Sequence, residues 1–261
     1  YDLFITDDCL SIAGRFKKVP TIIFTDNELN TVPEYAILLK FSNRIFAPNI
    51  VHLKHYEYKK IGFNGYKELA YLHPSYFTPD KKIIMKYNPL CEQYFFIRVV
   101  SMTASHDRGI IGLTNERIEE IIKILSPYGK IYISSERELP DKLSNYKLNI
   151  KAEEIIHLVN YSTIFIGDSG TMASEAAILG VPSIMFHDFI GNLKVMEEKE
   201  NKYGLMYGFR CNEFDKMLIK LKELLSIKDL KKTWLVKKEN MLKDKEDINL
   251  FFIKEIEKYK S

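Results

Sequence analysis

The sequence predicts an α/β protein built from parallel sheets, with two Rossmann-like domains facing each other across a cleft. Three observations support this prediction. Strand and helix patterns alternate along the chain, strand–turn–helix–strand units recur, and a proline-containing stretch separates two such series. A length of 261 residues is enough for one large or two modest domains.

The first series occupies residues 1–72 and forms the predicted N-terminal domain. Short apolar strands are expected at Leu3–Thr6, Thr21–Phe24, Arg44–Ala47 and Lys60–Phe63, with helices near Leu10–Phe16 and Glu34–Phe41. This is about half of a doubly wound domain. The chain starts directly in a strand without an initiator Met, so we expect an upstream portion and an incomplete first domain.

Residues 73–92 contain three prolines and no clear period, which predicts a linker. Residues 93–261 form the predicted second domain, which contains the candidate ligand-binding turn. Its expected strands are Tyr94–Val100, Lys130–Ser134, Ser162–Ile166 and Ser183–Phe186. Its expected helices are one capped by Thr114, Glu153–Val159, Thr171–Leu179, Phe214–Leu225 and a last one through Phe252 and Ile256. The late helices are expected to serve packing.

The turn from Gly167 to Gly170 joins a buried strand to an Ala-rich helix that ends at Gly180. A helix N-terminus carries unpaired N–H groups and a partial positive charge, so it can bind an anion. Ser169 and Thr171 add hydroxyl donors there, and Glu175, one turn on, could accept hydrogen bonds from sugar hydroxyls. The alternative is an ordinary N-cap with a Glu that suits the helix dipole. The turn matches neither the dinucleotide fingerprint nor a Walker loop.

Two further loops are expected at the same edge of the second sheet. His106 follows the first strand of that domain, and Ser134 with Glu136 follows the next. Open α/β sheets bind ligands at the carboxyl ends of their strands. We therefore expect a phosphorylated ligand near these loops and near the turn residues Gly167, Asp168, Ser169, Gly170 and Thr171. His106 could bind a diphosphate or act as an acid or base, or could be a surface-loop histidine beside Asp107.

Acidic residues follow the strands of the first domain in the same way. Asp8, Asp26 and Glu28 are candidates for a catalytic base in the cleft. Loop acids of this kind also commonly cap helices, and that alternative stays open.

The composition of the chain limits the classes of partner that we expect. The net charge is only +3, because 38 basic residues are offset by 35 acidic ones, which argues against a dedicated nucleic-acid binder. The three cysteines are widely spaced, which indicates reduced thiols and a cytoplasmic protein. No signal peptide and no apolar run of about 18 residues are present. Histidine spacing predicts no metal site. Peripheral membrane contact of the Lys-rich helices and formation of a homodimer are left open.

Four motifs occur in order along residues 1–209: NGYKELAYLHP (64–74), ASHD (104–107), ISSE (133–136) and GDSGTMASE (167–175). With these motifs the chain resembles the GT-B superfamily, and within it the non-hydrolysing UDP-N-acetylglucosamine 2-epimerases. Their D-S-G-G-x-x-E-E stretch is similar to Asp168–Glu175, which an A-x-x-L-G-V-P motif follows. The chain is more closely similar to a family of unknown function that shares this ancestry.

The resemblance implies roles for individual residues. Ser169 and the amides of Gly170 and Thr171 would hold the UDP phosphates, Glu175 would accept the ribose hydroxyls, and His106 would lie near the diphosphate. Asp8 and Asp26 fall roughly where the epimerases keep catalytic acids.

Several departures from the epimerase pattern bear on the reaction. Thr171 replaces the second glycine of the motif, Ser174 replaces the first Glu of the pair, and the histidine loop lacks G-H-R-R. The N-terminal strand with its basic residue is also absent. Nucleotide-sugar binding is therefore better supported than epimerisation.

We accordingly expect a GT-B glycosyltransferase-like enzyme that uses a UDP-sugar as substrate and holds no tightly bound cofactor. Its partners would be the nucleotide sugar and an unidentified acceptor in surface polysaccharide or glycoconjugate synthesis. One alternative is a UDP-sugar 2-epimerase, and another is a nucleotide-binding module or fragment without catalysis.

Overall fold

A computed structural model describes residues 2–101 and 112–259, and the chain divides into two compact units. Unit 1 comprises residues 1–73, 191–197 and 242–261, and unit 2 comprises residues 74–190 and 198–241. Each unit has a parallel sheet with its own helices. The predicted α/β class with parallel sheets is therefore confirmed, while the predicted cleft between the domains stays a prediction.

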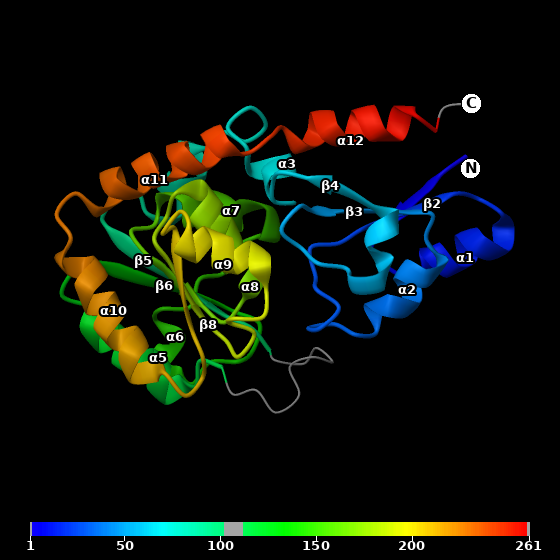
Figure 1. The fold of residues 1–261 in the computed structure, drawn as a ribbon. Coiled ribbons are helices and arrows are strands. Elements are labelled where there is room, and N and C mark those ends of the chain that lie inside the picture. The colour runs from blue at the N-terminus through cyan, green and yellow to red at the C-terminus, as the bar shows by residue number, and fades with distance from the viewer. Residues whose placement is uncertain (1, 102–111, 260–261) are drawn as a thin grey trace. The chain divides into compact units, whose positions relative to one another are not determined.

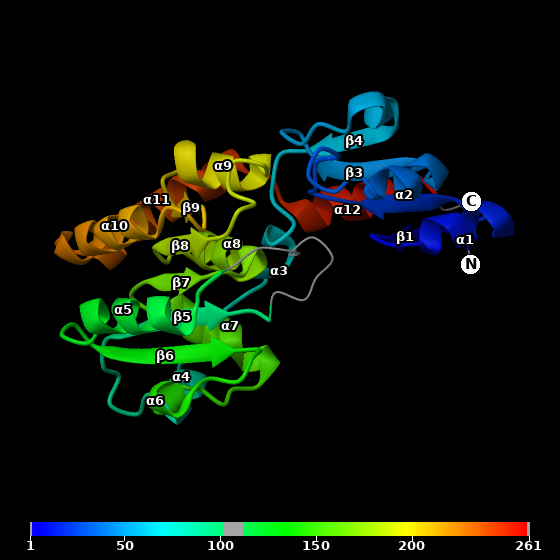
Figure 2. The same ribbon diagram turned by 90° about the horizontal axis from the view of Figure 1, so that it is seen from below.

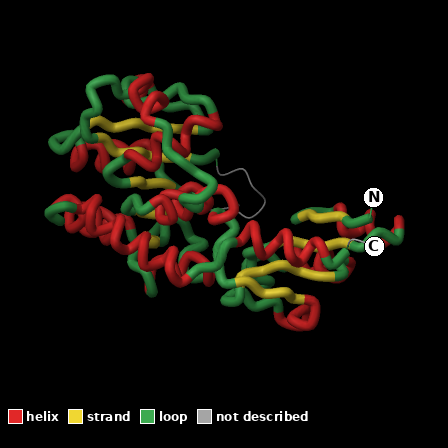
Figure 3. Tube along the Cα trace, turned by 90° about the horizontal axis from the view of Figure 1, so that it is seen from above, coloured by secondary structure: helices red, strands yellow, loops and turns green. Residues whose placement is uncertain are grey.

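The sheet of unit 1 follows the order of the chain. Its strands are all parallel and lie side by side (Figures 2 and 3): β1 (Phe4–Thr6), β2 (Thr21–Phe24), β3 (Arg44–Pro48) and β4 (Lys60–Phe63). The connecting helices are α1 (Leu10–Lys17), α2 (Tyr35–Phe41), the 3₁₀ helix η1 (Lys54–Lys59) and α3 (Leu69–Leu72). Ile22, Ile23, Ile45 and Phe46 are buried, as expected for apolar strands in a parallel sheet.

The last helix, α12 (Ile248–Glu257), packs on the sheet of unit 1 (Figure 1). The ring of Phe252 stacks on Phe46 at 5.6 Å and meets Phe24 edge-on at 5.2 Å. The ring of Phe251 lies 5.5 Å from Phe63. A segment about 200 residues away in sequence thus supplies part of the apolar cover that these strands need.

The sheet of unit 2 is also parallel, in the order β6-β5-β7-β8-β9 (Figure 2). The strands are β5 (Tyr94–Val99), β6 (Lys130–Ser135), β7 (Phe165–Gly167), β8 (Ser183–Phe186) and β9 (Met206–Phe209). Its helices include α4 (Lys81–Tyr87), α5 (Asn115–Leu125), α6 (Asp141–Ser144), α7 (Ala152–Tyr161), α8 (Gly170–Leu179) and α10 (Phe214–Ser226). Two of the four unit boundaries fall within helices, one in α9 (Lys194–Asn201) and one in α11 (Leu230–Asp244).

The strand order of unit 2 reverses direction at β5. The chain passes from β5 to β6 on one side and then crosses back to β7 on the other side. Such a reversal opens a crevice at the carboxyl ends of the two central strands, which is where open α/β sheets bind ligands. The ends of β5 and β7 are therefore the place to look for a site in this unit.

Capping residues set the ends of the predicted helices. The Thr114 hydroxyl accepts a hydrogen bond from the Arg117 N–H at the start of α5. Ser169 caps α8 in the same way, and Gly180 ends that helix with a left-handed φ of 78°. Both helices confirm the predictions made from sequence.

One predicted strand is displaced in the structure. The run Ser162–Ile166 was expected to be a strand, but β7 spans Phe165–Gly167 and Ser162 ends helix α7. The Ser162 hydroxyl donates to the Val159 carbonyl at 2.7 Å, so this residue completes the helix instead of starting the strand.

Some elements were not predicted at all, namely η1, α3, α4, α6, α9, β9 and α11. Helix α4 lies in the stretch expected to be a linker. Asp80 caps it by accepting the Lys82 N–H at 2.8 Å, and Pro79 and Pro89 lie outside the helix on either side. The prolines therefore mark the limits of an element within this stretch.

No helix of the described residues has the length and apolar character needed to cross a membrane.

Candidate functional site

Arg98 lies at the centre of the carboxyl edge of the unit 2 sheet. Strand register places it opposite Ser134 on β6 and opposite Gly167 on β7. Its Nη1 donates to the Ser134 hydroxyl at 2.7 Å, and its Nη2 forms an ion pair with Glu136. Glu136 also accepts the Ser101 N–H at 3.1 Å. The predicted site residues Ser134 and Glu136 are therefore held together by an arginine that sequence reasoning missed.

The Arg98 guanidinium has unused hydrogen-bonding capacity. Its Nε is buried and has no hydrogen-bond partner among the described residues. Arginine presents several N–H donors in a fixed fork that suits carboxylates and phosphates. The signal that could have identified Arg98 is its position, since a charged residue interrupts the buried apolar run of β5.

Gly167 permits close approach of the two central strands. A Cβ at this position would lie 2.9 Å from the Arg98 carbonyl oxygen, which is closer than real contacts allow. Gly167 therefore has a packing reason to be glycine, in addition to its predicted role near a ligand.

Asp168 is a buried residue of the turn between β7 and α8. Its carboxylate accepts the Val100 N–H at 2.8 Å and the Leu113 N–H at 3.1 Å, so it ties the end of β5 to the residue before the α5 cap. Burial raises the pKa of Asp168 to about 6, although these N–H groups and the charge of Arg137 act in the opposite direction. Asp168 thus supports the shape of the site.

The N-terminus of α8 supplies the other predicted residues. Ser169 is half-buried and its hydroxyl accepts the Met172 N–H at 3.4 Å, while Thr171 is exposed. The N–H groups of Gly170 and Thr171 lie in the first turn, where no acceptor exists within the helix. Glu175 is half-buried one turn further along. The helix end therefore presents donors beside the turn that follows β7.

The loops that follow β8 and β9 are joined by a hydrogen bond. His187 directly follows β8, is buried, and accepts the Phe189 N–H on Nδ1 at 3.1 Å. Asp188 accepts the Cys211 N–H at 2.8 Å. Burial, together with the Asp188 charge, raises the pKa of the Cys211 thiol to about 11. These contacts fix the loop geometry, and the thiol stays protonated at neutral pH.

The remaining prediction for this unit, His106, lies outside the described residues.

The predicted acids of unit 1 lie after β1 and β2 but have different surroundings. Asp8 is exposed and accepts the Leu10 N–H and the Thr6 hydroxyl, which lower its pKa, so it closes the turn that precedes α1. Asp26 forms an ion pair with Lys67 at 3.0 Å. Glu28 is buried. The catalytic roles of all three stay predictions.

Lys67 is a second basic residue that sequence reasoning did not single out for the site. Burial lowers the pKa of its amine, but the carboxylates of Asp26 and Glu68 outweigh burial and raise the pKa above its usual value. Lys67 therefore stays charged at the carboxyl edge of the unit 1 sheet.

Among the described residues, no group of histidine, cysteine and acidic side chains could hold a metal ion.

Solved structures of UDP-GlcNAc 2-epimerases and of glycosyltransferases share the fold of this chain. The chain is similar to UDP-GlcNAc 2-epimerase from Neisseria meningitidis bound to UDP-GlcNAc, with a TM-score of 0.61, 19% identity, and coverage of 92% of this chain and 76% of that one. It is also similar to the Methanocaldococcus jannaschii UDP-GlcNAc 2-epimerase in complex with UDP-GlcNAc and UDP, with a TM-score of 0.58, 16% identity, and coverage of 88% and 70%.

A glycosyltransferase from Rickettsia africae has a TM-score of 0.54 and 19% identity, covering 99% of this chain and 76% of that one. At these identities the likeness concerns the fold. The chain belongs to the family described as protein of unknown function (DUF354), whose model matches residues 14–250. No curated protein sequence matches the chain.

Proposed function

We propose that unit 2 binds a nucleotide sugar, with a UDP moiety, at the carboxyl edge of its sheet. One observation carries this proposal: Arg98, Ser134 and Glu136 meet at the strand-order reversal, next to the strand whose turn leads into the N-terminus of α8. A guanidinium and the N–H groups in the first turn of a helix are both suited to a diphosphate. Two structural neighbours contain UDP-GlcNAc, which agrees with this substrate class.

The proposed arrangement assigns separate tasks to the residues. Arg98, Ser169 and the N–H groups of Gly170 and Thr171 would contact the diphosphate, and Glu175 would accept the ribose hydroxyls. In a transfer reaction, these donors would stabilise the negative charge that develops on the departing UDP. No metal ion is required by this set of donors.

We further propose glycosyl transfer to an acceptor in polysaccharide or glycoconjugate synthesis as the overall reaction. Asp26 and Glu28, which were predicted from the sequence, stay the candidates for the base that deprotonates the acceptor hydroxyl. A second candidate reaction is 2-epimerisation of a UDP-sugar. The chain is similar in fold to UDP-GlcNAc 2-epimerases, and this similarity favours the second candidate.

Calorimetric titration of the full chain with UDP tests the binding proposal, with GDP and CDP for comparison. We expect selective UDP binding that weakens about tenfold or more in Arg98→Met, Ser169→Ala and Glu175→Ala, since each loses a hydrogen bond to a charged group. Glu153→Ala is the control, because it removes an exposed carboxylate from the start of α7 in the same unit. Unchanged UDP affinity in all three site variants would contradict the assignment.

The two reactions are separated by their products. Incubation with a UDP-sugar and candidate acceptors should release UDP only when an acceptor is present if the enzyme is a transferase. Sugar inversion without an acceptor, seen by nuclear magnetic resonance, would identify an epimerase instead. Unaltered UDP-sugar in both assays, with UDP binding intact, would indicate a binding module.

A further inference from the structure

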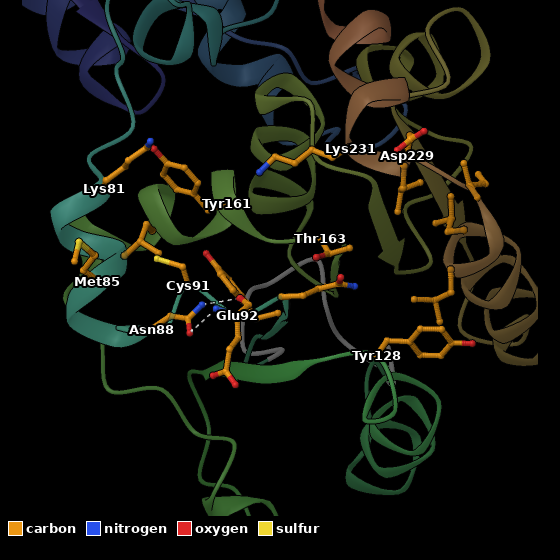
Figure 4. A pocket seen from close by; sticks show the side chains of 17 residues that line it. Lys81, Met85, Asn88, Cys91, Glu92, Tyr128, Tyr161, Thr163, Asp229 and Lys231 are labelled. Carbon is orange, nitrogen blue, oxygen red and sulfur yellow. Dashed lines mark hydrogen bonds between the residues drawn. The ribbon is translucent and has the colours of Figure 1, made fainter.

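A cavity of about 830 Å³ opens in unit 2, away from the site described above (Figure 4). Gln93, Thr163 and Tyr128 line it, and each precedes a strand of the sheet, so the cavity is at the amino edge. Its other walls come from α4, the end of α10 and the start of α11. The volume is in the range of sites that hold small molecules.

This cavity and the proposed nucleotide site lie at opposite ends of the same strands. Strand β5 runs from Tyr94, which lines the cavity, to the Arg98 region at the other edge. A strand rises about 3.3 Å per residue, so a β5 of this length separates the two edges by roughly 15–20 Å. A molecule in the cavity could not react with a sugar held at the carboxyl edge of this unit, so the cavity is a separate site.

The walls of the cavity are largely apolar. Ile84, Leu224 and Leu230 are buried at its base, whereas Met85 and Tyr128 are 55% and 51% exposed at its rim. Large apolar side chains exposed around one hollow indicate a surface that a ligand can cover. The shape and the lining therefore suit a molecule with an apolar body.

Two lysines supply positive charge to one end of this cavity. Lys81 and Lys231 lie on either side of Tyr161 in Figure 4, and the Lys231 amine is 5.4 Å from the centre of the Tyr161 ring. Neither amine has an ion-pair partner in the part of the chain that the structure describes. Lys81 and Lys231 are both exposed, so a ligand in the cavity can reach both amines.

The acidic residues of the cavity do not neutralise these amines. Glu92 forms an ion pair with Lys130, and Figure 4 shows its carboxylate at the far end of the cavity from Lys81 and Lys231. Asp229 also lines the cavity, but Lys231 extends from α11 away from it and towards Tyr161. The end of the cavity near Tyr161 is therefore positively charged, and Ile84, Met85 and Leu230, on the same helices as the two lysines, give it apolar walls.

We propose that this cavity binds a small amphiphilic anion, a carboxylate on an apolar chain, with the carboxylate bound by the Lys81 and Lys231 amines beside Tyr161. The apolar chain would cover Ile84, Met85 and Leu230, and the anion would replace water around two amines that have no ion-pair partner among the described residues. Binding at this edge would not require nucleotide binding at the other.

Cys91 provides the test, because it lines the cavity and its side chain is exposed. In a Cys9→Ser background the remaining cysteine, Cys211, is half-buried with a raised thiol pKa and reacts slowly. The rate at which a thiol reagent modifies Cys91 then reports occupancy. We expect decanoate, below its micelle concentration, to protect Cys91, and decanol or acetate to protect it at least about tenfold less well.

Matched lysines give the controls. Lys81→Met with Lys231→Met should weaken protection by decanoate about tenfold. The neighbouring exposed pair, Lys82→Met with Lys232→Met, does not line the cavity and should leave protection unchanged. Equal rates of Cys91 modification without decanoate in all variants would show that the cavity is intact. Absence of protection by decanoate, equal protection by decanol, or equal effects of the two lysine pairs would each overturn the proposal.

Discussion

Replacing Asp168 by asparagine removes a buried carboxyl group and keeps its shape. Burial raises the pKa of Asp168 from 3.8 to about 6, so the folded chain favours the protonated form more than the unfolded chain does. A carboxyl group of this kind stabilises the fold most at low pH, and the stability that it contributes is lost as the pH rises from about 4 to about 6.

The size of the effect follows from the shift in pKa. A difference of about two pKa units corresponds to about 3 kcal/mol, most of which, about 2 kcal/mol, falls between pH 4 and pH 7. Asparagine does not titrate, so the Asp168→Asn variant lacks this term. Its amide NH₂ also faces the Val100 or the Leu113 N–H, which adds a destabilisation of about 1–3 kcal/mol at both pH values.

The measurement is the free energy of unfolding of both proteins by urea at pH 4 and at pH 7. Comparing the two proteins cancels the other titrating groups, which they share. We expect the destabilisation caused by Asp168→Asn to be about 2 kcal/mol greater at pH 4 than at pH 7. An equal destabilisation at both pH values, or a greater one at pH 7, would refute a raised pKa of Asp168. It would mean that the hydrogen bonds from the Val100 and Leu113 N–H groups outweigh the effect of burial on that pKa.

Two further predictions concern packing and helix ends. Gly167→Ala should destabilise the fold by about 1–3 kcal/mol in urea unfolding, because the new Cβ would lie 2.9 Å from the Arg98 carbonyl oxygen; an unchanged midpoint would contradict this close approach. Lys59→Met should cost about 2–3 kcal/mol, since the buried Lys59 amine donates to the carbonyls of Leu39, Lys40 and Ser42 at the end of α2. Lys40→Met, an exposed change on the same helix, is its control, and similar costs for both variants would argue against this capping role.

The sequence by itself determined most of the strands and several helices. Buried parallel strands are continuous apolar runs, so Thr21–Phe24 and Ser183–Phe186 were predicted with the bounds that the structure has. Helices α5 and α8 could be placed because Thr114, Ser169 and Gly180 carry capping information in the chain itself. These features depend on local propensity and periodicity.

Only the tertiary structure decided which distant residues meet. Arg98 joins Ser134 to Glu136 because strand register places β5 beside β6, and register cannot be derived from local sequence. Phe252 of α12 completes the core over Phe46, although the two residues are far apart in the chain. Asp168 resembled a ligand-binding residue in sequence, and its burial against two backbone N–H groups became evident only in the fold. Such contacts depend on how complete elements pack, which local patterns do not specify.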